Sequence, residues 1–509
     1  MKTLLLKFCC TLAALIALGS SVQAEITLPA LFSDHMVIQA GAAVPIWGWA
    51  AAGETISVST GPQSLTTQAQ ADGSWRVTLE KMPSGTVLAI TCRAANTVTI
   101  QDALVGEVWL CSGQSNMEMP VKRARDAERE QAAARFPQLR VFKVERQTSL
   151  TPLARCAGHW VVCSPETAGD FSATAFYFGR ELHTTQGMPI GLIVSAWSGS
   201  AIEAWTSREA QETQAPLREL LATWDSKDRA YTDEIAAREK DAYQRARAQW
   251  QASLRELRAA GKPAPKAPRP PRDPHTDWHH PAVLFNGMIA PLIPFSLRGA
   301  IWYQGESNAL TDDSSALYAR QLPLLIDDWR RRWGQGDFPF AWVQLPFISN
   351  KTVHWARMRE SMRQTLSTPQ TGMAVTIDLG EPRLLHPKNK QDFAHRLALW
   401  ARANVYGAPL KWSGPLPAEH WTRGQEIVVR FQHAAGLRAQ DGELRGFEIA
   451  GDDHRFLPAQ ARIEGELVIV SSPDVAQPAA ARYSWSNLPD GNLINSADLP
   501  ASPFRTDDW

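Results

Sequence analysis

The alternation of apolar and polar residues predicts a small all-β domain near the start of the chain. Between residues 25 and 105, short alternating segments are separated by turn residues. The clearest segments are Val44–Trp49, Thr55–Ser59 and Ser74–Leu79. A period of two residues is typical of strands that bury one face, and the spacing of these segments is typical of a β-sandwich.

From residue 106 the pattern changes to continuous apolar runs separated by helical periodicity. The runs cover 107–111, 139–144, 191–197, 299–303, 340–345 and 373–377, and the helical patterns cover 173–185, 315–333, 355–366 and 390–403. Buried strands that alternate with helices are typical of a parallel sheet covered on both faces. We therefore predict an α/β core over residues 106–404. Alternating segments return at 426–431 and 466–470 and predict a second β domain over residues 405–509.

A charged segment interrupts this core. Residues 208–260 carry apolar side chains at mostly helical intervals, and Pro216 predicts a break near the start of the segment. Residues 262–271 are rich in proline and predict a stiff, extended spacer. We therefore expect a solvated helical insertion at about residues 208–280.

The first 24 residues have the pattern of a secretory signal. Lys2 and Lys7 precede a short apolar run at 8–18, and Val22-Gln23-Ala24 fits a cleavage site. The run is shorter than the roughly 20 residues that a transmembrane helix needs, and no later stretch reaches 18 consecutive apolar residues. We expect cleavage after Ala24, a periplasmic or secreted protein, and no membrane span.

The composition argues against nucleic acid as a partner. Lys and Arg number 52 and Asp and Glu number 52, so the chain has no net charge to attract a polyanion. The 20 tryptophans, against 7 tyrosines, suit stacking on sugar rings, although tryptophan equally fills the cores of β-rich domains. Composition alone therefore does not decide between these two uses.

Four cysteines lie beyond the signal segment: Cys92, Cys111, Cys156 and Cys163. An even number in an oxidising compartment permits disulfide bonds, and the short separation of Cys156 and Cys163 makes that pair our expectation. The spacing of these cysteines is not that of a zinc site, so we expect no structural metal.

Polar clusters follow three of the predicted buried strands. The clusters are Gly113-Gln114-Ser115-Asn116-Met117, Ser198-Gly199-Ser200 and Gln304-Gly305-Glu306-Ser307-Asn308. Ligands of α/β sheets bind at the carboxyl ends of the strands, so we expect these clusters to meet at one edge. A serine there is presented to solvent, and a glutamine side chain can donate to an oxyanion as a backbone N–H does.

A serine nucleophile needs a base within hydrogen-bond reach, and His386 is the candidate. This histidine lies in a loop between the run at 373–377 and the next helical pattern, and therefore at the same edge of the sheet. His275, His279 and His280 follow the proline-rich spacer, where we expect solvated side chains rather than a metal cluster.

Five different sequence motifs follow one another along the chain. They are Leu31-Phe32-Ser33-Asp34-His35-Met36-Val37, Gly113-Gln114-Ser115-Asn116-Met117, Trp302-Tyr303-Gln304-Gly305-Glu306-Ser307-Asn308, His386-Pro387-Lys388-Asn389-Lys390 with Arg396-Leu397-Ala398, and Pro503-Phe504-Arg505-Thr506. In this order they resemble the sialate O-acetylesterase family of the SGNH-hydrolase superfamily. The resemblance covers essentially the whole chain after the signal segment.

The resemblance implies a flavodoxin-like, three-layer α/β core of the SGNH-hydrolase type, with accessory all-β domains before and after it. It implies that Ser115 is the nucleophile and His386 the general base. The implied oxyanion hole consists of the N–H groups of Ser115 and Gly199 and the side chain of Gln304. The implied substrate is an O-acetylated carbohydrate, and no metal or organic cofactor is implied.

The chain departs from the family pattern just before the histidine. Relatives commonly carry an acidic residue two or three positions earlier, where this chain has Leu384 and Arg383. The sequence leaves two alternatives open. Either Asp378 or Glu381 orients His386, or the site is a Ser–His dyad oriented by a backbone carbonyl.

The resemblance also leaves the acceptor sugar open. Acetylated sialic acid is our leading expectation, and acetylated xylan or xyloglucan is the alternative, because acetyl groups on different glycans present the same carbonyl. Two other hypotheses are a non-catalytic glycan-binding protein, which the absent acid favours, and a glycosidase that uses Glu306 but lacks a second carboxylate. The presence of Ser115, Gln304 and His386 together favours the esterase.

Overall fold

The computed structural model describes residues 25–350 and 352–509. The predicted signal segment at residues 1–24 lies outside the described residues. Within the described part of the chain, no helix is long and apolar enough to cross a membrane.

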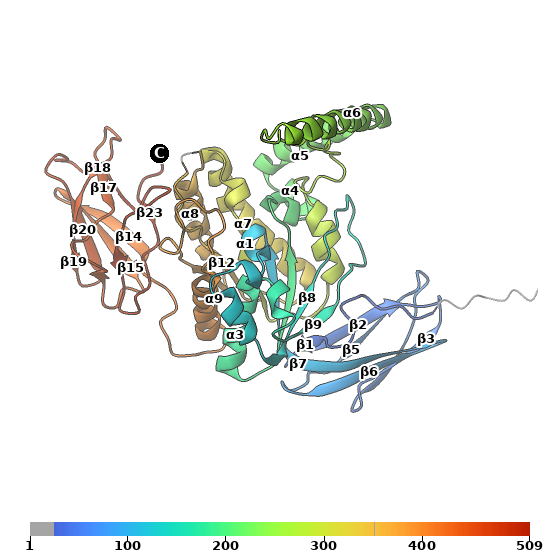
Figure 1. The fold of residues 1–509 in the computed structure, drawn as a ribbon. Helices are drawn as coiled ribbons and strands as arrows, with labels where there is room; N and C mark the ends of the chain where they lie inside the picture. The colour runs from blue at the N-terminus through green and yellow to red at the C-terminus, as the bar shows by residue number, and fades with distance from the viewer. Residues whose placement is uncertain (1–24, 351) are drawn as a thin grey trace, which may run out of the picture.

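A mostly parallel sheet forms the centre of the molecule (Figure 1). Its strands follow the order β13-β12-β11-β7-β10-β8-β9. Their bounds are β7 (Thr97–Gly113), β8 (Phe136–Lys143), β9 (Trp160–Cys163), β10 (Ile190–Ala196), β11 (Gly299–Tyr303), β12 (Phe340–Val343) and β13 (Thr371–Ala374). All neighbours are parallel except β8 and β9. The mixed α/β architecture predicted from the apolar runs is confirmed.

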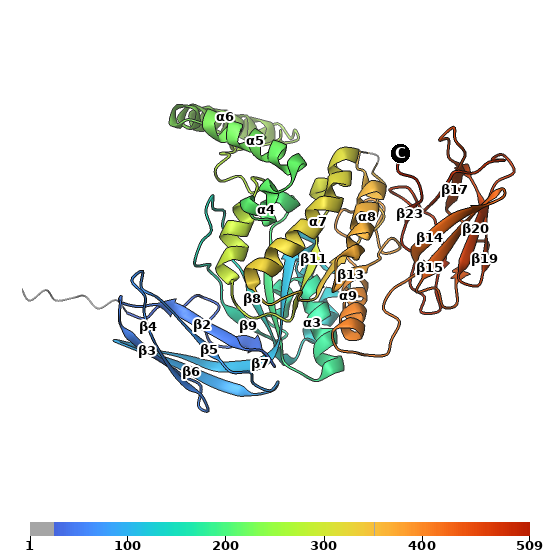
Figure 2. The same ribbon diagram turned by 180° about the vertical axis from the view of Figure 1, so that it is seen from behind.

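Helices cover both faces of this sheet. They include α3 (Ala173–Gln186), α7 (Asp312–Trp333) and α9 (Lys390–Asn404). Consecutive side chains of a strand point to opposite faces, and on β11 Trp302 packs edge-on against Trp329 of α7, whereas Tyr303 stacks on Phe393 of α9. α3 packs beside α9 (Figure 2).

The long strand β7 joins the central sheet to the β region that precedes it. Residues 97–104 of β7 pair with β6 (Val87–Arg93) and residues 104–106 pair with β1 (Val37–Gln39), whereas residues 107–113 pair with β10. The other strands of this region are β2 (Val44–Trp49), β3 (Thr55–Ser59), β4 (Ser64–Gln68) and β5 (Ser74–Leu79). β3 and β4 continue the sheet of β6, and β2 and β5 form a second sheet. The expected boundary between residues 105 and 106 therefore falls inside one continuous strand.

The residues after α9 form a β region with its own hydrophobic core (Figure 1). Its two larger sheets have the orders β14-β15-β20-β19 and β18-β17-β21-β23. The bounds are β14 (Leu416–Arg423), β15 (Glu426–Gln432), β17 (Phe447–Ala450), β18 (Leu457–Pro458), β19 (Gln460–Glu464), β20 (Leu467–Ser471), β21 (Ala480–Tyr483) and β23 (Phe504–Arg505). The buried Arg359 of α8 (Trp355–Gln364) links this region to the core by donating to the carbonyls of Ser486 and Asn487.

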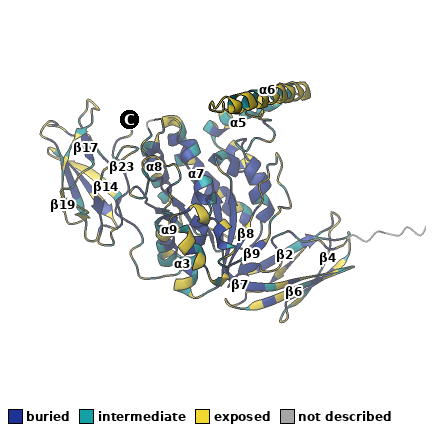
Figure 3. Ribbon diagram, viewed as in Figure 1, coloured by how far each residue is buried: buried dark blue, intermediate teal, exposed yellow. Residues whose placement is uncertain are grey.

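The charged segment folds into three helices, of which the first packs against α7 and the last extends away from the sheet (Figure 1). They are α4 (Arg208–Glu212), α5 (Ala215–Ala230) and α6 (Asp233–Ala259). Pro216 lies in the first turn of α5, so the predicted break is confirmed, and a second break occurs where Thr232 caps α6. No residue of α6 is buried (Figure 3), as expected for a solvated arm.

The expected disulfide bond between Cys156 and Cys163 is absent, because the four cysteines of the described residues are all free thiols. Cys163 lies on β9 with its Sγ 3.7 Å from the carbonyl oxygen of Ala134. The chain between the two cysteines runs into this extended strand, so the prediction from sequence spacing was wrong. Burial raises the pKa of Cys92, Cys156 and Cys163 to about 11.

We predict that a chain beginning at Glu25 contains four thiols that folding protects. A thiol-reactive dye should label all four in denaturant without reductant. It should label the native chain far more slowly, because the sulfur atoms are buried and protonated at neutral pH. Fewer than four labelled thiols in denaturant would reveal a disulfide bond and contradict the prediction.

Candidate active site

The three polar clusters meet at the carboxyl edge of the central sheet. β11, β7 and β10 are neighbours, and Gly113 pairs with Tyr303 on one side and with Ala196 on the other. The three strands therefore end at the same level. The turns that follow them lie side by side and contain the predicted clusters.

Ser115 begins the short helix α1 (Ser115–Glu118) directly after β7. Gly113 has a φ of +140°, and a Cβ there would lie 2.2 Å from the carbonyl oxygen of Tyr303, so this position requires glycine. The N–H of Gln114 donates to the same carbonyl (3.0 Å). The end of β11 thus fixes the turn that presents the Ser115 hydroxyl.

His386 lies beside Ser115, although it is 271 residues further along the chain. His386 Nε2 is 2.8 Å from Ser115 Oγ, the distance at which a histidine can accept the proton of a serine hydroxyl. Burial, together with the positive charges of Lys390 and Arg123, lowers the pKa of His386. The imidazole is therefore neutral at pH 7 and able to act as a base.

Neither of the expected acids contacts the imidazole of His386. Asp378 forms a bidentate ion pair with Arg396, with distances of 2.5 and 2.6 Å. Glu381 Oε1 accepts from the backbone N–H of Lys388 (2.7 Å), so it holds the chain after the histidine instead of the ring. Among residues 25–350 and 352–509, neither a carboxylate nor a backbone carbonyl forms a hydrogen bond with His386. Both expected acids are thus committed to other partners, and the geometry is that of a Ser–His pair.

Asn116 holds the peptide that precedes His386. Its Nδ2 donates to the carbonyl of Leu385 (3.1 Å) and to Glu306 Oε1 (2.5 Å). Its Oδ1 accepts from Lys390 Nζ (2.6 Å). One buried side chain beside the serine therefore connects three motifs and fixes the histidine through the backbone.

Glu306 and Lys390 are charged residue types in a buried environment. Burial raises the pKa of Glu306, and burial lowers the pKa of Lys390 to about 7. Glu306 Oε2 has no hydrogen-bond partner among the described residues. Asn116 supplies a hydrogen bond to both groups, so its removal would leave each of them less satisfied in the interior.

Gln304 is completely buried, and its side-chain amide is already engaged. Its Nε2 donates to the carbonyl of Ser200 (3.1 Å) and to Asn308 Oδ1 (2.8 Å), and its Oε1 accepts from the Tyr318 hydroxyl (2.9 Å). Both amide hydrogens are used, so Gln304 as placed offers none to an oxyanion beside the serine. Its contacts instead fasten the turns after β10 and β11 to each other.

The two expected backbone donors are not engaged. Within the described residues, the N–H groups of Ser115 and Gly199 donate to no protein acceptor. Glu118 of α1 fixes the Gly199 turn, because its Oε2 accepts from the N–H (3.0 Å) and the hydroxyl (2.6 Å) of Ser198. Arg146 donates to the other oxygen of Glu118.

A cavity of about 390 Å³ opens above Ser115 and His386. The charged residues of its lining are Lys122, Arg123, Lys143, Arg146, Glu118 and Asp170. Lys122 pairs with Asp170 (2.5 Å), and Arg146 pairs with Glu118. The side chains of Arg123 and Lys143 form no ion pair or hydrogen bond with any described residue, although the charge of Lys143 acts on Asp170. The cavity therefore presents surplus positive charge beside the Ser–His pair.

The three histidines after the proline-rich spacer each lie against an aspartate. The pairs are His275 with Asp273 (3.0 Å), His279 with Asp277 (2.8 Å) and His280 with Asp228 (2.9 Å). His280 is buried, which contradicts the expected solvation, because Trp224 of α5 packs on its ring. In the part of the chain that the structure describes, no group of three or more His, Cys, Asp or Glu side chains could hold a metal ion.

Comparison with known families identifies the chain. The family model for "Carbohydrate esterase, sialic acid-specific acetylesterase" matches residues 105–258 and 275–398. The chain belongs to this family. The two matched segments contain Ser115, Gly199, Gln304 and His386, and the unmatched interval contains the proline-rich spacer. As a member of this esterase family, the protein is a carboxylic ester hydrolase.

Similar proteins cover nearly the whole chain. The sialate O-acetylesterase of Mus musculus is 31% identical over 528 residues, which is 92% of this chain and 92% of the mouse protein. The human sialate O-acetylesterase is 30% identical over 526 residues, which is 93% of this chain and 91% of the human protein. The crystal structure of a carbohydrate acetylesterase from Xanthomonas citri is 37% identical, has a TM-score of 0.80, and covers 95% of this chain and 100% of its own.

The support that Asn116, Glu306 and Lys390 give to the site was not predicted from the sequence. All three lie in the motifs that carry the family resemblance, and Asn116 is adjacent to Ser115. Their position in these motifs is the sequence feature that could have indicated a role in the site. Their mutual contacts could not be derived from the sequence, because 190 residues separate Asn116 from Glu306 and 274 separate it from Lys390.

We predict that Asn116→Ala lowers kcat for ester hydrolysis by up to about 100-fold, because the peptide before His386 loses its anchor and small displacements of a catalytic group are costly. KM for 4-nitrophenyl acetate should change little. The matched control is Asn404→Ala, which removes a hydrogen bond to the Trp400 carbonyl at the end of α9. Thermal unfolding of both variants shows that the assay temperature lies below Tm. An unchanged kcat in folded Asn116→Ala would contradict this role.

Proposed function

We propose that the protein is a secreted carbohydrate O-acetylesterase that removes acetyl groups from sugar hydroxyls through a serine acetyl-enzyme. The substrate that we assign to it is acetylated sialic acid. The observation that carries the proposal is the 2.8 Å contact between Ser115 Oγ and His386 Nε2 at the carboxyl edge of the sheet. The proposal includes the assignment of the core to the flavodoxin-like, SGNH-hydrolase type. It also includes export, which rests on the sequence pattern of residues 1–24.

The proposed reaction has two halves. Ser115 Oγ attacks the acetyl carbonyl carbon while His386 Nε2 takes the hydroxyl proton. The tetrahedral intermediate collapses, the sugar oxygen leaves with that proton, and the acetyl group stays on Ser115. Water then attacks the acetyl-enzyme with His386 again as the base, which releases acetate and restores the serine.

The negative charge on the tetrahedral oxygen needs hydrogen-bond donors. The unengaged N–H groups of Ser115 and Gly199 are the donors that we assign to it. Gln304 would serve only after breaking one of the two hydrogen bonds that its Nε2 donates. We therefore propose an oxyanion hole formed by two backbone N–H groups.

The histidine in this mechanism works without a carboxylate partner. Its lowered pKa keeps the imidazole neutral, and the surrounding cations Lys390 and Arg123 disfavour the imidazolium that forms during the attack. Asn116 and Glu381 compensate in position, because they hold the peptides before and after the histidine. We expect a working but slower base than one in a full triad.

The surplus positive charge of the cavity supports an acidic sugar as substrate. The side chains of Arg123 and Lys143 form no hydrogen bond or ion pair within the described residues, and an arginine pairs well with a carboxylate. Sialic acid carries a carboxylate, whereas xylose and the sugars of xyloglucan do not. The names of the mouse and human relatives agree with this choice.

We predict that the chain starting at Glu25 releases acetate from 4-nitrophenyl acetate and from an O-acetylated sialic acid, and that Ser115→Ala and His386→Ala lower kcat by at least about 1000-fold. Matched controls are Ser64→Ala and His420→Ala, which change exposed strand residues of the two β regions. Equal rates for all five proteins would refute the serine mechanism. Hydrolysis of acetylated xylan or xyloglucan in preference to acetylated sialic acid would refute the substrate assignment alone.

The lowered pKa of His386 predicts the pH at which kcat/KM falls on the acid side of the pH profile, the acid limb. Only the neutral imidazole accepts the proton, so kcat/KM for 4-nitrophenyl acetate should fall as pH drops through a pKa below the ordinary value of about 6.5. Arg123→Met removes one cause of the lowered pKa and should shift this limb upward by a few tenths of a pH unit. The control is Arg383→Met, which removes an exposed cation of the His386 loop that does not contribute to the lowered pKa. A limb above pH 6.5 in the unaltered protein would be inconsistent with the assignment.

A further inference from the structure

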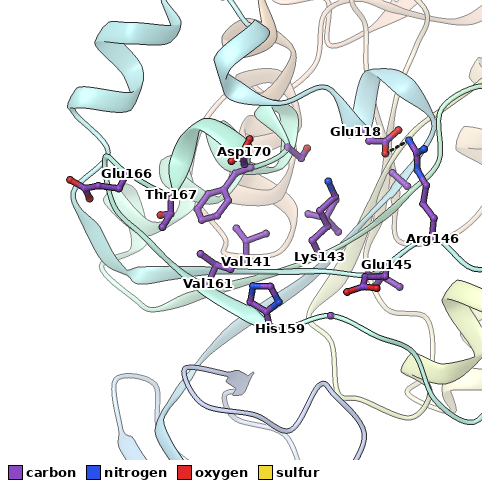
Figure 4. A pocket seen from close by; sticks show the side chains of 16 residues that line it. Glu118, Val141, Lys143, Glu145, Arg146, His159, Val161, Glu166, Thr167 and Asp170 are labelled. Carbon is purple, nitrogen blue, oxygen red and sulfur yellow. Dashed lines mark hydrogen bonds and ion pairs between the residues drawn. The ribbon is translucent and has the colours of Figure 1, made fainter.

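A second, larger hollow lies beside the catalytic cavity (Figure 4). Its volume is about 800 Å³, within the range of ordinary ligand sites. Val141 of β8 and Val161 of β9 pair across the two strands and form part of its floor. Phe171 and Val194 add to this apolar surface. We call this hollow the β8–β9 groove.

The groove is continuous with the catalytic cavity. Glu118, Lys143, Arg146 and Asp170 line both of them. Two of these shared residues, Glu118 and Arg146, form an ion pair, which Figure 4 shows, and we call the region of the shared residues the junction. A ligand whose acetyl group reaches Ser115 can therefore extend past these shared residues into the groove.

The lining of the groove suits a neutral sugar. An apolar floor packs against the C–H faces of a sugar ring, and polar groups at the rim bond its hydroxyls. Lys143, Glu145 and His159 line the groove, and their side chains form no hydrogen bond or ion pair with any described residue. Because Glu118 and Asp170 are neutralised by Arg146 and Lys122, the remaining charges are of both signs and do not favour an anion.

We propose that the β8–β9 groove binds the neutral sugar to which the acetylated residue is glycosidically linked. This inference rests on the proposed function. The carboxylate and the glycosidic oxygen of a linked sialic acid are on the same carbon atom, so a carboxylate near Lys143 at the junction directs the next sugar into the groove. The enzyme then acts on acetylated sialic acid that is still attached to a glycan, in preference to the free sugar.

The test compares two substrates: an O-acetylated sialic acid as the free sugar, and the same acetylated residue linked to lactose. We expect kcat/KM for acetate release to be at least about tenfold higher for the linked form. Val161→Trp fills the floor of the groove and should remove this preference, while the rates with the free sugar and with 4-nitrophenyl acetate stay unchanged. Val161→Ala leaves the groove open and should keep the preference.

Val87→Trp is the matched control, because it places a tryptophan at an exposed position of β6. Equal kcat/KM for the two sugars in the unaltered enzyme would overturn the groove assignment while the proposed function stands. A Val161→Trp variant that keeps the preference would overturn it as well. A variant that instead loses activity only toward 4-nitrophenyl octanoate would show that the groove holds an acyl chain. Release of acetate from 4-nitrophenyl acetate but from neither sugar would refute the proposed substrate, and the groove assignment with it.

Discussion

The geometry of the site depends on the register of three parallel strands. Gly113 of β7 pairs with both Tyr303 of β11 and Ala196 of β10, so three turns that are far apart in sequence begin at one level. The contacts between these turns follow from that alignment. Gln304 fastens the turn after β10 to the turn after β11, and Glu118 fastens α1 to the turn that carries Gly199. A shift of one residue in β7 would turn its side chains to the opposite faces of the sheet.

The histidine loop is held in a different way from the loops of a serine–histidine–aspartate triad. In a triad the acid contacts the imidazole itself and selects its tautomer. Here the supporting bonds act on the backbone on each side of His386, from Asn116 to the Leu385 carbonyl and from Glu381 to the Lys388 N–H. The support is therefore positional and contributes no negative charge to the ring. This difference agrees with the lowered pKa of His386, because the charges that act on the ring, those of Lys390 and Arg123, are positive.

Much of the fold could be predicted from the sequence, because buried parallel strands read as continuous apolar runs. The run at 299–303 became β11 without a change of bounds, whereas the run at 373–377 became a strand that ends earlier, at Ala374. Ser115 and His386 could be named because motifs mark them. The hydrogen-bond partners of Gln304, Asp378 and Glu381 could not be predicted, because the groups within reach of each side chain are determined by the tertiary fold. The disulfide prediction failed for the same reason, since closeness in sequence does not set the distance across an extended strand.

The central position of β7 has a consequence for the order in which the molecule is completed. β7 emerges early in synthesis, but its neighbour β11 and the loop of His386 emerge much later, 271 residues after Ser115 in the case of the histidine. Contacts this distant in sequence require long loops to close, and proteins that depend on them fold slowly. The strands of the β region that precedes residue 107 can pair with one another before β11 and the His386 loop are synthesised. A nascent or truncated chain that ends before His386 therefore holds Ser115 on an unfinished sheet without its neighbouring histidine, and under the proposed mechanism it hydrolyses no ester.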